Sequence, residues 1–268
     1  SAASLDNSFG RIANTGTAAS TLNAAVINNA GGTLGSNGDL TLNAGTLLNT
    51  QQALIFSGNT LTLNAANQLS NNQSKIYAFG NLNFNRAGAN FDNTAGDISS
   101  SGSSYFNVGS VHNQSGSVTS GTDITLAANS FDGNGRLIAN RNANLALQGS
   151  YIYRAGNLFG ANGNLSLSVA DVFTNQTAFE APGNLTINAT HITNDAGASI
   201  NANQTSLNAA GHILNNGRID GSSIFTSSNQ LTNNAAIIGN NIQLSANTLV
   251  NQNGSAIIAA TNNINLWV

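Results

Sequence analysis

Hydrophobic and polar residues alternate in short segments that recur along the chain. These segments read Gly, Asp or Asn, Leu, a polar residue, and then Leu, Ile or Phe, as at residues 38–42, 80–84, 163–167 and 183–187. Alternation with a period of two is typical of a β-strand with one buried face, and Gly-Asp or Gly-Asn before it is typical of a turn. The pattern predicts a short strand at each place and no helix.

A second signature divides the chain into units: an apolar residue, a mostly polar residue, and then an anchor asparagine. The anchors are Asn7, Asn29, Asn49, Asn71, Asn93, Asn113, Asn175, Asn194, Asn215, Asn233 and Asn251. In two further units the signature is degenerate, and Gly133 or Arg154 stands at the anchor position in place of asparagine. Single apolar residues after the anchor turns predict another short strand: Ile12, Ile55, Ile76, Ile98, Val118, Leu137, Ile200, Ile219, Ile237 and Ile257. Successive units are 18 to 22 residues long, so thirteen of them cover the sequence.

Units this short cannot bury an apolar face alone, so they must stack on one another. The sequence therefore predicts an all-β fold, a parallel β-helix of about 13 coils that forms a single domain over residues 1–268. Equivalent residues would lie about 4.8 Å apart in neighbouring coils. Interior Leu, Ile, Val and Phe would supply the core, and the anchor asparagines would form a structural ladder bonded from amide to amide.

Composition narrows the possible functions. Only 6% of the residues are charged and the net charge is -3, whereas nucleic-acid binding requires a basic surface. The absence of cysteine excludes disulfides, iron–sulfur clusters and zinc sites with cysteine ligands. Apolar runs are far shorter than the roughly 20 residues of a membrane helix. We therefore expect no nucleic-acid partner and no transmembrane segment.

The ends of the chain resemble ordinary repeat units. The sequence has no Met and no signal-peptide pattern, and neither end reads as the atypical capping unit that solenoids carry. These features favour an internal segment of a longer exoprotein.

Tandem units of about 20 residues that read Leu-x-Asn, Gly-x-Ile and Gly-Asp/Asn-Leu-x-Leu resemble filamentous haemagglutinin repeats over essentially all 268 residues. Such repeats occur in the TpsA exoproteins of two-partner secretion in Gram-negative bacteria, and CdiA-type contact-dependent growth inhibition proteins share them. The resemblance implies a right-handed β-helix, export through an outer-membrane two-partner-secretion transporter, and a secreted or cell-surface location. It also implies a virulence-associated adhesin, or a toxin-displaying stalk, that meets a host or neighbouring-bacterium receptor or glycan.

The alternative is a polysaccharide-binding or polysaccharide-degrading β-helix protein, because parallel β-helices also host lyases and hydrolases. Glycoside hydrolysis needs carboxylates within about 5 to 10 Å of each other on one face. Asp39 and Asp123 share an offset within their units but lie four coils apart, and Glu180 is the only glutamate. We therefore expect a rod without enzyme activity, with no catalytic residues, no metal and no cofactor.

One polar column is a candidate binding surface. Asp92, His112 and Asp132 each precede the anchor position in three consecutive units, so we expect a ladder at about 4.8 Å spacing. A solvated column with a modest ion pair is the simplest interpretation. A receptor or glycan contact and a metal site are the alternatives, although three ligands in line fit tetrahedral coordination poorly. His191 and His212 also share one offset and are expected to stack as a structural pair.

Aromatic residues extend this candidate surface. If Ile152 faces inward, alternation sends Tyr151 and Tyr153 to the outside. Exposed paired aromatics are favoured in binding surfaces because they bring a large contact area. Together with Asp132 and Val172 on adjoining coils, they complete a candidate receptor or glycan contact patch. A simple cover over an irregular coil is the alternative.

Overall fold

The computed structural model describes residues 2–268, which contain strands and turns but no helix. The strands belong to two compact units, one that ends at Arg141 and one that spans Asn142–Val268. In both units each strand pairs in parallel with its equivalent in the next coil, and the chain makes about 13 turns. The all-β parallel solenoid expected from the sequence is therefore confirmed.

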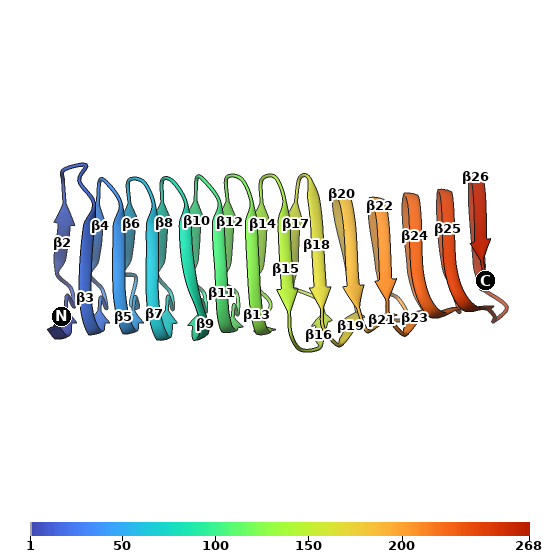
Figure 1. The fold of residues 1–268 in the computed structure, drawn as a ribbon, viewed down its shortest axis with the longest axis horizontal. Coiled ribbons are helices and arrows are strands. Elements are labelled where there is room, and N and C mark those ends of the chain that lie inside the picture. The colour runs from blue at the N-terminus through green and yellow to red at the C-terminus, as the bar shows by residue number, and fades with distance from the viewer. Residues whose placement is uncertain (1) are drawn as a thin grey trace. The chain divides into compact units, whose positions relative to one another are not determined.

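The first unit contains strands of two kinds that alternate along the chain. The long strands are β1 (Ala2–Asp6), β3 (Ser20–Asn28), β5 (Leu40–Leu48), β7 (Leu61–Ser70), β9 (Leu82–Asp92), β11 (Ser104–His112) and β13 (Ile124–Asp132). The short strands are β2 (Arg11–Asn14), β4 (Thr33–Ser36), β6 (Leu54–Ser57), β8 (Lys75–Ala78), β10 (Asp97–Ser100), β12 (Ser117–Ser120) and β14 (Arg136–Ala139). Strands of one kind stack side by side (Figure 1).

Like residues lie above like residues in the first unit. Leu40 pairs with Leu61, which in turn pairs with Leu82, and all three side chains are buried. On the short strands, Ile55 pairs with Ile76 in the same way. Because alternate residues of a strand point to opposite faces, this register places these apolar positions inside the coils.

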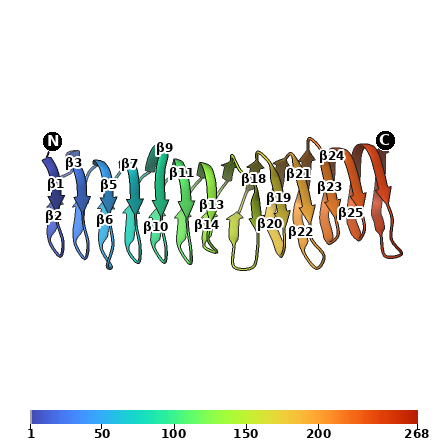
Figure 2. The ribbon, with the colours of Figure 1, turned by 90° about the horizontal axis from the view of Figure 1, so that it is seen from below.

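The second unit contains strands of more varied length. They are β15 (Ala143–Leu147), β16 (Tyr151–Tyr153), β17 (Leu158–Ala161), β18 (Asn164–Val169), β19 (Val172–Asn175), β20 (Ala178–Ala189), β21 (His191–Asn194), β22 (Ser199–Ala209), β23 (His212–Asn215), β24 (Arg218–Asn233), β25 (Ala236–Asn251) and β26 (Ile257–Trp267). Figure 2 shows these strands following one another coil by coil. Strand β24 pairs with both β22 and β23, so one continuous strand replaces two.

The apolar column of the last coil differs by one residue from the sequence prediction. Ile237 pairs with Ile258, whereas Ile257 pairs with Ala236 and is 50% exposed. The expectation that Ile257 occupies the inward column was wrong, because a shift of one residue along a strand reverses the face of every side chain.

Buried asparagines form hydrogen-bonded ladders inside both units. In the first unit Asn7 Nδ2 donates to Asn29 Oδ1 at 2.7 Å, and the same bond continues at 2.7 to 2.8 Å through Asn49, Asn71, Asn93 and Asn113. In the second unit it links the buried Asn175, Asn194, Asn215 and Asn233, and ends at the exposed Asn251, at 2.7 to 2.9 Å. These are the amide-to-amide bonds expected from the sequence.

The column of anchor positions holds other residues between Asn113 and Asn175. Gly133 follows Asp132, the register partner of His112, and so stands at the anchor position without a side chain to carry the ladder. Tyr153 pairs with Asn175 and occupies the anchor position in its own coil. Each ladder is therefore contained within one unit.

Candidate interaction surface

The polar column of the first unit lies at the ends of three neighbouring strands. His112 ends β11 and pairs in register with Asp92 of β9 and Asp132 of β13. His112 Nδ1 lies 3.2 Å from Asp132 Oδ2, and the two side chains are 49% and 81% exposed. An ion pair this open to solvent contributes little to stability.

Asp92 bonds to its own turn rather than to the histidine in this column. Its Oδ1 accepts hydrogen bonds from the backbone N of Thr94 at 2.9 Å and from Thr94 Oγ1 at 2.6 Å. This is a local turn bond of the kind that Asp often makes two residues ahead. The column thus presents a histidine–carboxylate pair to solvent beside a carboxylate that is already bound to its own turn.

The predicted aromatic part of the patch is wrong. Tyr151 and Tyr153 are only 5% and 2% exposed, and Ile152 between them is 39% exposed. Tyr151 pairs with Phe173, and Ile152 pairs with Thr174. The sequence pattern instead aligned Ile152 with Phe173, so the observed register differs from the predicted one by one residue. A shift of one residue exchanges the inner and outer faces. The two tyrosines cannot contact a receptor from this position.

The tyrosines instead pack in the core of an irregular coil. The ring of Tyr153 stacks on Phe179 with centroids 4.3 Å apart, and its hydroxyl donates to the backbone oxygen of Asn157 at 3.0 Å. Tyr151 stacks on Phe159 at 5.5 Å. Burial raises the pKa of Tyr153 above its ordinary value. Val172, the remaining member of the predicted patch, is half-buried on β19, where it pairs with His191.

The two histidines of the second unit are neighbours, as their shared offset predicts. His191 Nδ1 accepts a hydrogen bond from the backbone N of His212 at 3.1 Å, and His212 Nε2 lies 3.0 Å from Thr232 Oγ1. Burial, followed by the charge of His191, lowers the pKa of His212. Within residues 2–268, no group of three or more His, Asp or Glu side chains is arranged to hold a metal ion.

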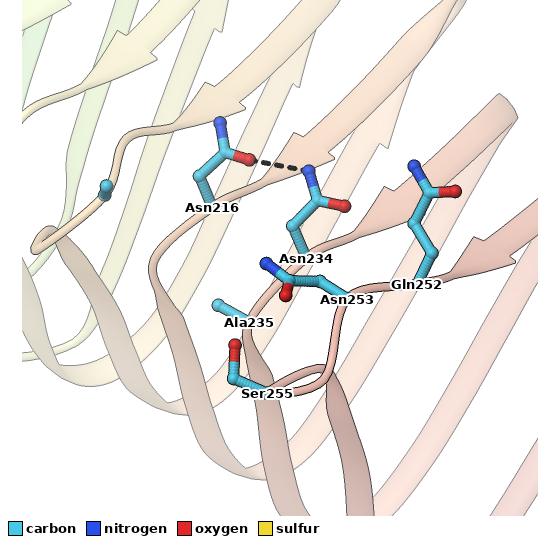
Figure 3. A pocket seen from close by; sticks show the side chains of 7 residues that line it. Asn216, Asn234, Ala235, Gln252, Asn253 and Ser255 are labelled. Carbon is cyan, nitrogen blue, oxygen red and sulfur yellow. Dashed lines mark hydrogen bonds between the residues drawn. The ribbon is translucent and has the colours of Figure 1, made fainter.

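A groove on the second unit has no counterpart among the sequence predictions. It has a volume of about 670 Å³ and lies beside the ladder, lined by Asn216, Asn234, Gln252, Asn253 and Ser255 together with two alanines. Figure 3 shows Asn234 donating its hydrogen bond to Asn216 across neighbouring coils. Asn216, Asn234 and Gln252 each follow an anchor asparagine, so their common offset was the signal that could have identified the column.

Parallel strands stacked in register around a core of apolar columns and asparagine ladders define a β-solenoid repeat protein. A family model described as Haemagglutinin repeat matches residues 1–73, 80–149, 139–235 and 218–266, and the chain belongs to this family. Comparisons with curated proteins and with solved structures gave no match.

Proteins of the haemagglutinin repeat family are secreted surface exoproteins, and the family is generally structural or adhesive. The part of the chain that the structure describes has no helix with the length and hydropathy of a membrane span.

Proposed function

We propose that the chain is a non-catalytic segment of a large TpsA-type surface exoprotein and forms part of an elongated rod that presents a receptor-binding surface. In this proposal a Gram-negative bacterium exports it through an outer-membrane two-partner-secretion transporter. The observation that carries the proposal is the family match over nearly the whole chain, on strands that stack in register.

The separate roles of inward and outward residues support this proposal. Inward Leu, Ile and Phe and the buried asparagines hold the coils together, so outward positions such as His112 and Asp132 are free for recognition. Neighbouring outward side chains lie about 4.8 Å apart along the stack, which gives a long surface with a regular spacing. A solenoid can thus vary its contacts without disturbing its core.

The acidic residues support the absence of catalysis in this proposal. Asp123 forms an ion pair with Arg141, Asp220 lies 2.5 Å from Arg218 Nε, and Asp39 accepts from Asn59 Nδ2 at 2.7 Å. Each of these carboxylates is therefore bonded to a side chain of its own coil or of a neighbouring coil. A hydrolase would instead need two of them converging on one bond.

Binding of the purified chain to host epithelial cells and to bacterial cells tests the proposed role. We expect saturable binding to at least one of them, and a weaker signal from the double variant His112→Ala and Asp132→Ala if the column takes part. The single variant Asn107→Ala, on another outward position of β11, is the matched control. A chain that binds neither cell type, and that a two-partner transporter does not export, would contradict the proposal.

The choice between an adhesin and a growth inhibition stalk depends on sequence outside this chain. A toxin domain and an adjacent immunity gene would identify the stalk of a contact-dependent growth inhibition system. Their absence from the complete gene and its neighbours would favour an adhesin.

The alternative function, a polysaccharide-binding or polysaccharide-degrading protein, predicts a different result. Incubation with plant and bacterial polysaccharides followed by sizing of the products tests for cleavage. We expect the chain lengths to stay unchanged. Reproducible shortening would overturn the non-catalytic assignment.

A further inference from the structure

The groove of the second unit is built from carboxamides whose backbones are already held in place. Asn216 N donates to Asn194 O at 2.8 Å, Asn234 N donates to Asn215 O at 2.8 Å, and Gln252 N donates to Asn233 O at 3.1 Å. Each bond joins a groove residue to an anchor asparagine of the preceding coil. The groove side chains therefore start from fixed positions in successive coils, which lowers the entropy cost of binding a ligand.

The side chains in the groove leave donors and acceptors available. Asn234 Nδ2 donates to Asn216 Oδ1 at 2.8 Å, which uses one polar atom of each amide. Asn216 Nδ2 and Asn234 Oδ1 then have no further partner among the described residues, and neither do the carboxamides of Gln252 and Asn253. A carboxamide offers two donors and two acceptor lone pairs. The groove thus presents both kinds of group within the width of a few coils (Figure 3).

The groove is also uncharged. None of its lining residues is acidic or basic, and the nearby Arg218, which lines an adjoining depression, is bonded to Asp220. Its volume of about 670 Å³ lies within the roughly 300 to 1,000 Å³ that small-molecule sites occupy. A charged ligand would find no counter-charge in this groove, and a mainly apolar ligand would leave the carboxamides without partners.

We propose that this groove binds neutral sugar residues of a glycan. Sugar hydroxyls donate and accept hydrogen bonds at short spacing, which matches adjacent carboxamides and the hydroxyl of Ser255. A peptide is a poorer match, because peptide recognition relies on a free strand edge or on pockets for apolar anchors. The inference rests on the proposed function, since a glycan on a cell surface would serve as a receptor for the rod.

Titration of the 268-residue chain with neutral sugars tests the site. The probes are methyl glucoside, methyl galactoside, N-acetylglucosamine and lactose, and the readout is the NMR signals of the Asn216, Asn234, Gln252 and Asn253 carboxamides. We expect at least one sugar to shift these signals in a saturable way. The variants Gln252→Ala and Asn234→Ala should weaken that binding by about tenfold or more.

Asn247→Ala is the matched control. Asn247 Nδ2 donates to Asn229 Oδ1 at 2.8 Å, the same bond between neighbouring coils as in the groove, but on an exposed surface elsewhere in the unit. Its sugar affinity should equal that of the unmodified chain. Gln252→Ala also keeps the test decisive if Asn234→Ala unfolds, because the Gln252 side chain is exposed and carries no structural bond.

Two results would overturn the inference: no carboxamide shift with any sugar, or shifts produced by a Gly-Ser peptide but by no sugar. Cell binding by the unmodified chain separates this site from the broader proposal. If no sugar shifts the carboxamide signals but the unmodified chain binds cells, the sugar site fails while the receptor-binding function stands. If sugars shift the NMR signals of the unmodified chain but the chain binds no cell, the sugar site stands and the receptor-binding function fails.

Discussion

Within each unit, buried anchor asparagines connect a coil to the coils on either side. Asn93 is fully buried, accepts from Asn71 Nδ2 at 2.8 Å, and donates to Asn113 Oδ1 at 2.8 Å and to the backbone oxygen of Gly96 at 3.3 Å. A single amide can do this because it carries both donors and acceptors. Aspartate is similar in size but would stack like charges at short range, which is unfavourable in a buried column.

We expect Asn71→Ala to destabilise the protein by about 1 to 3 kcal/mol, the cost of leaving buried polar groups without partners. The substitution removes the acceptor for Asn49 Nδ2 and the donor to Asn93 Oδ1. Urea unfolding measures the free energy. The control Asn107→Ala removes an outward bond to Asn85 and should cost within about 0.5 kcal/mol. Equal costs for the two variants would contradict a structural role of the buried ladder.

The lowered pKa of His212 predicts a dependence of stability on pH. Because burial and His191 favour the neutral imidazole in the folded state, the unfolded chain binds more protons as the pH falls below about 6.5. The contribution is fully present above that pH and is lost as the pH falls through the folded pKa. The free energy of unfolding of His212→Gln should therefore fall less between neutral and mildly acidic pH. A parallel decline in both proteins would argue against this linkage.

At the scale of strands, the length of each coil decides which face a residue takes. The alternating segments predicted strands correctly, since period-two patterning survives wherever one face is buried. Around β16, however, the order Tyr-Ile-Tyr alternates without saying which residues face inward. Stacking on Phe159 and Phe179 buries the two tyrosines and leaves Ile152 outside.

This register makes the relative costs of two substitutions a direct test. Tyr153→Ala removes a buried ring and should cost about 3 to 5 kcal/mol, as for other large aromatics in cores. Ile152→Ala should cost far less, because Ile152 is 39% exposed. Thermal and urea unfolding compare the two variants. The reverse order would show that the tyrosines lie outside.

At the scale of the whole chain, apolar stacking and amide hydrogen bonds, rather than ion pairs, are the main interactions between coils. Seven basic and ten acidic residues are spread over 268 positions, and the ion pairs that involve Arg141 and Arg218 lie within a single unit each. Columns of uncharged side chains suit a repeat protein, since like residues stacked at about 4.8 Å would repel if they carried charge.

A surface with so few basic residues should not bind DNA through its phosphates. We expect no change in the fluorescence anisotropy of a labelled duplex on addition of the protein at low salt. Binding that weakens steeply as salt is added would reveal a basic surface and contradict this expectation.

The repeat, the parallel stacking and the asparagine ladders could be predicted from the sequence alone. A side chain that recurs at nearly constant spacing must meet its counterpart if each unit buries its apolar face on the next. The faces of Tyr151 and Tyr153, and the groove formed by Asn216, Asn234 and Gln252, were decided by the tertiary structure. The faces of the two tyrosines depend on a register that differs by one residue, which the alternation in the sequence does not contain. The shared offset of the three groove residues is present in the sequence, but the hollow that they line forms only when the coils stack.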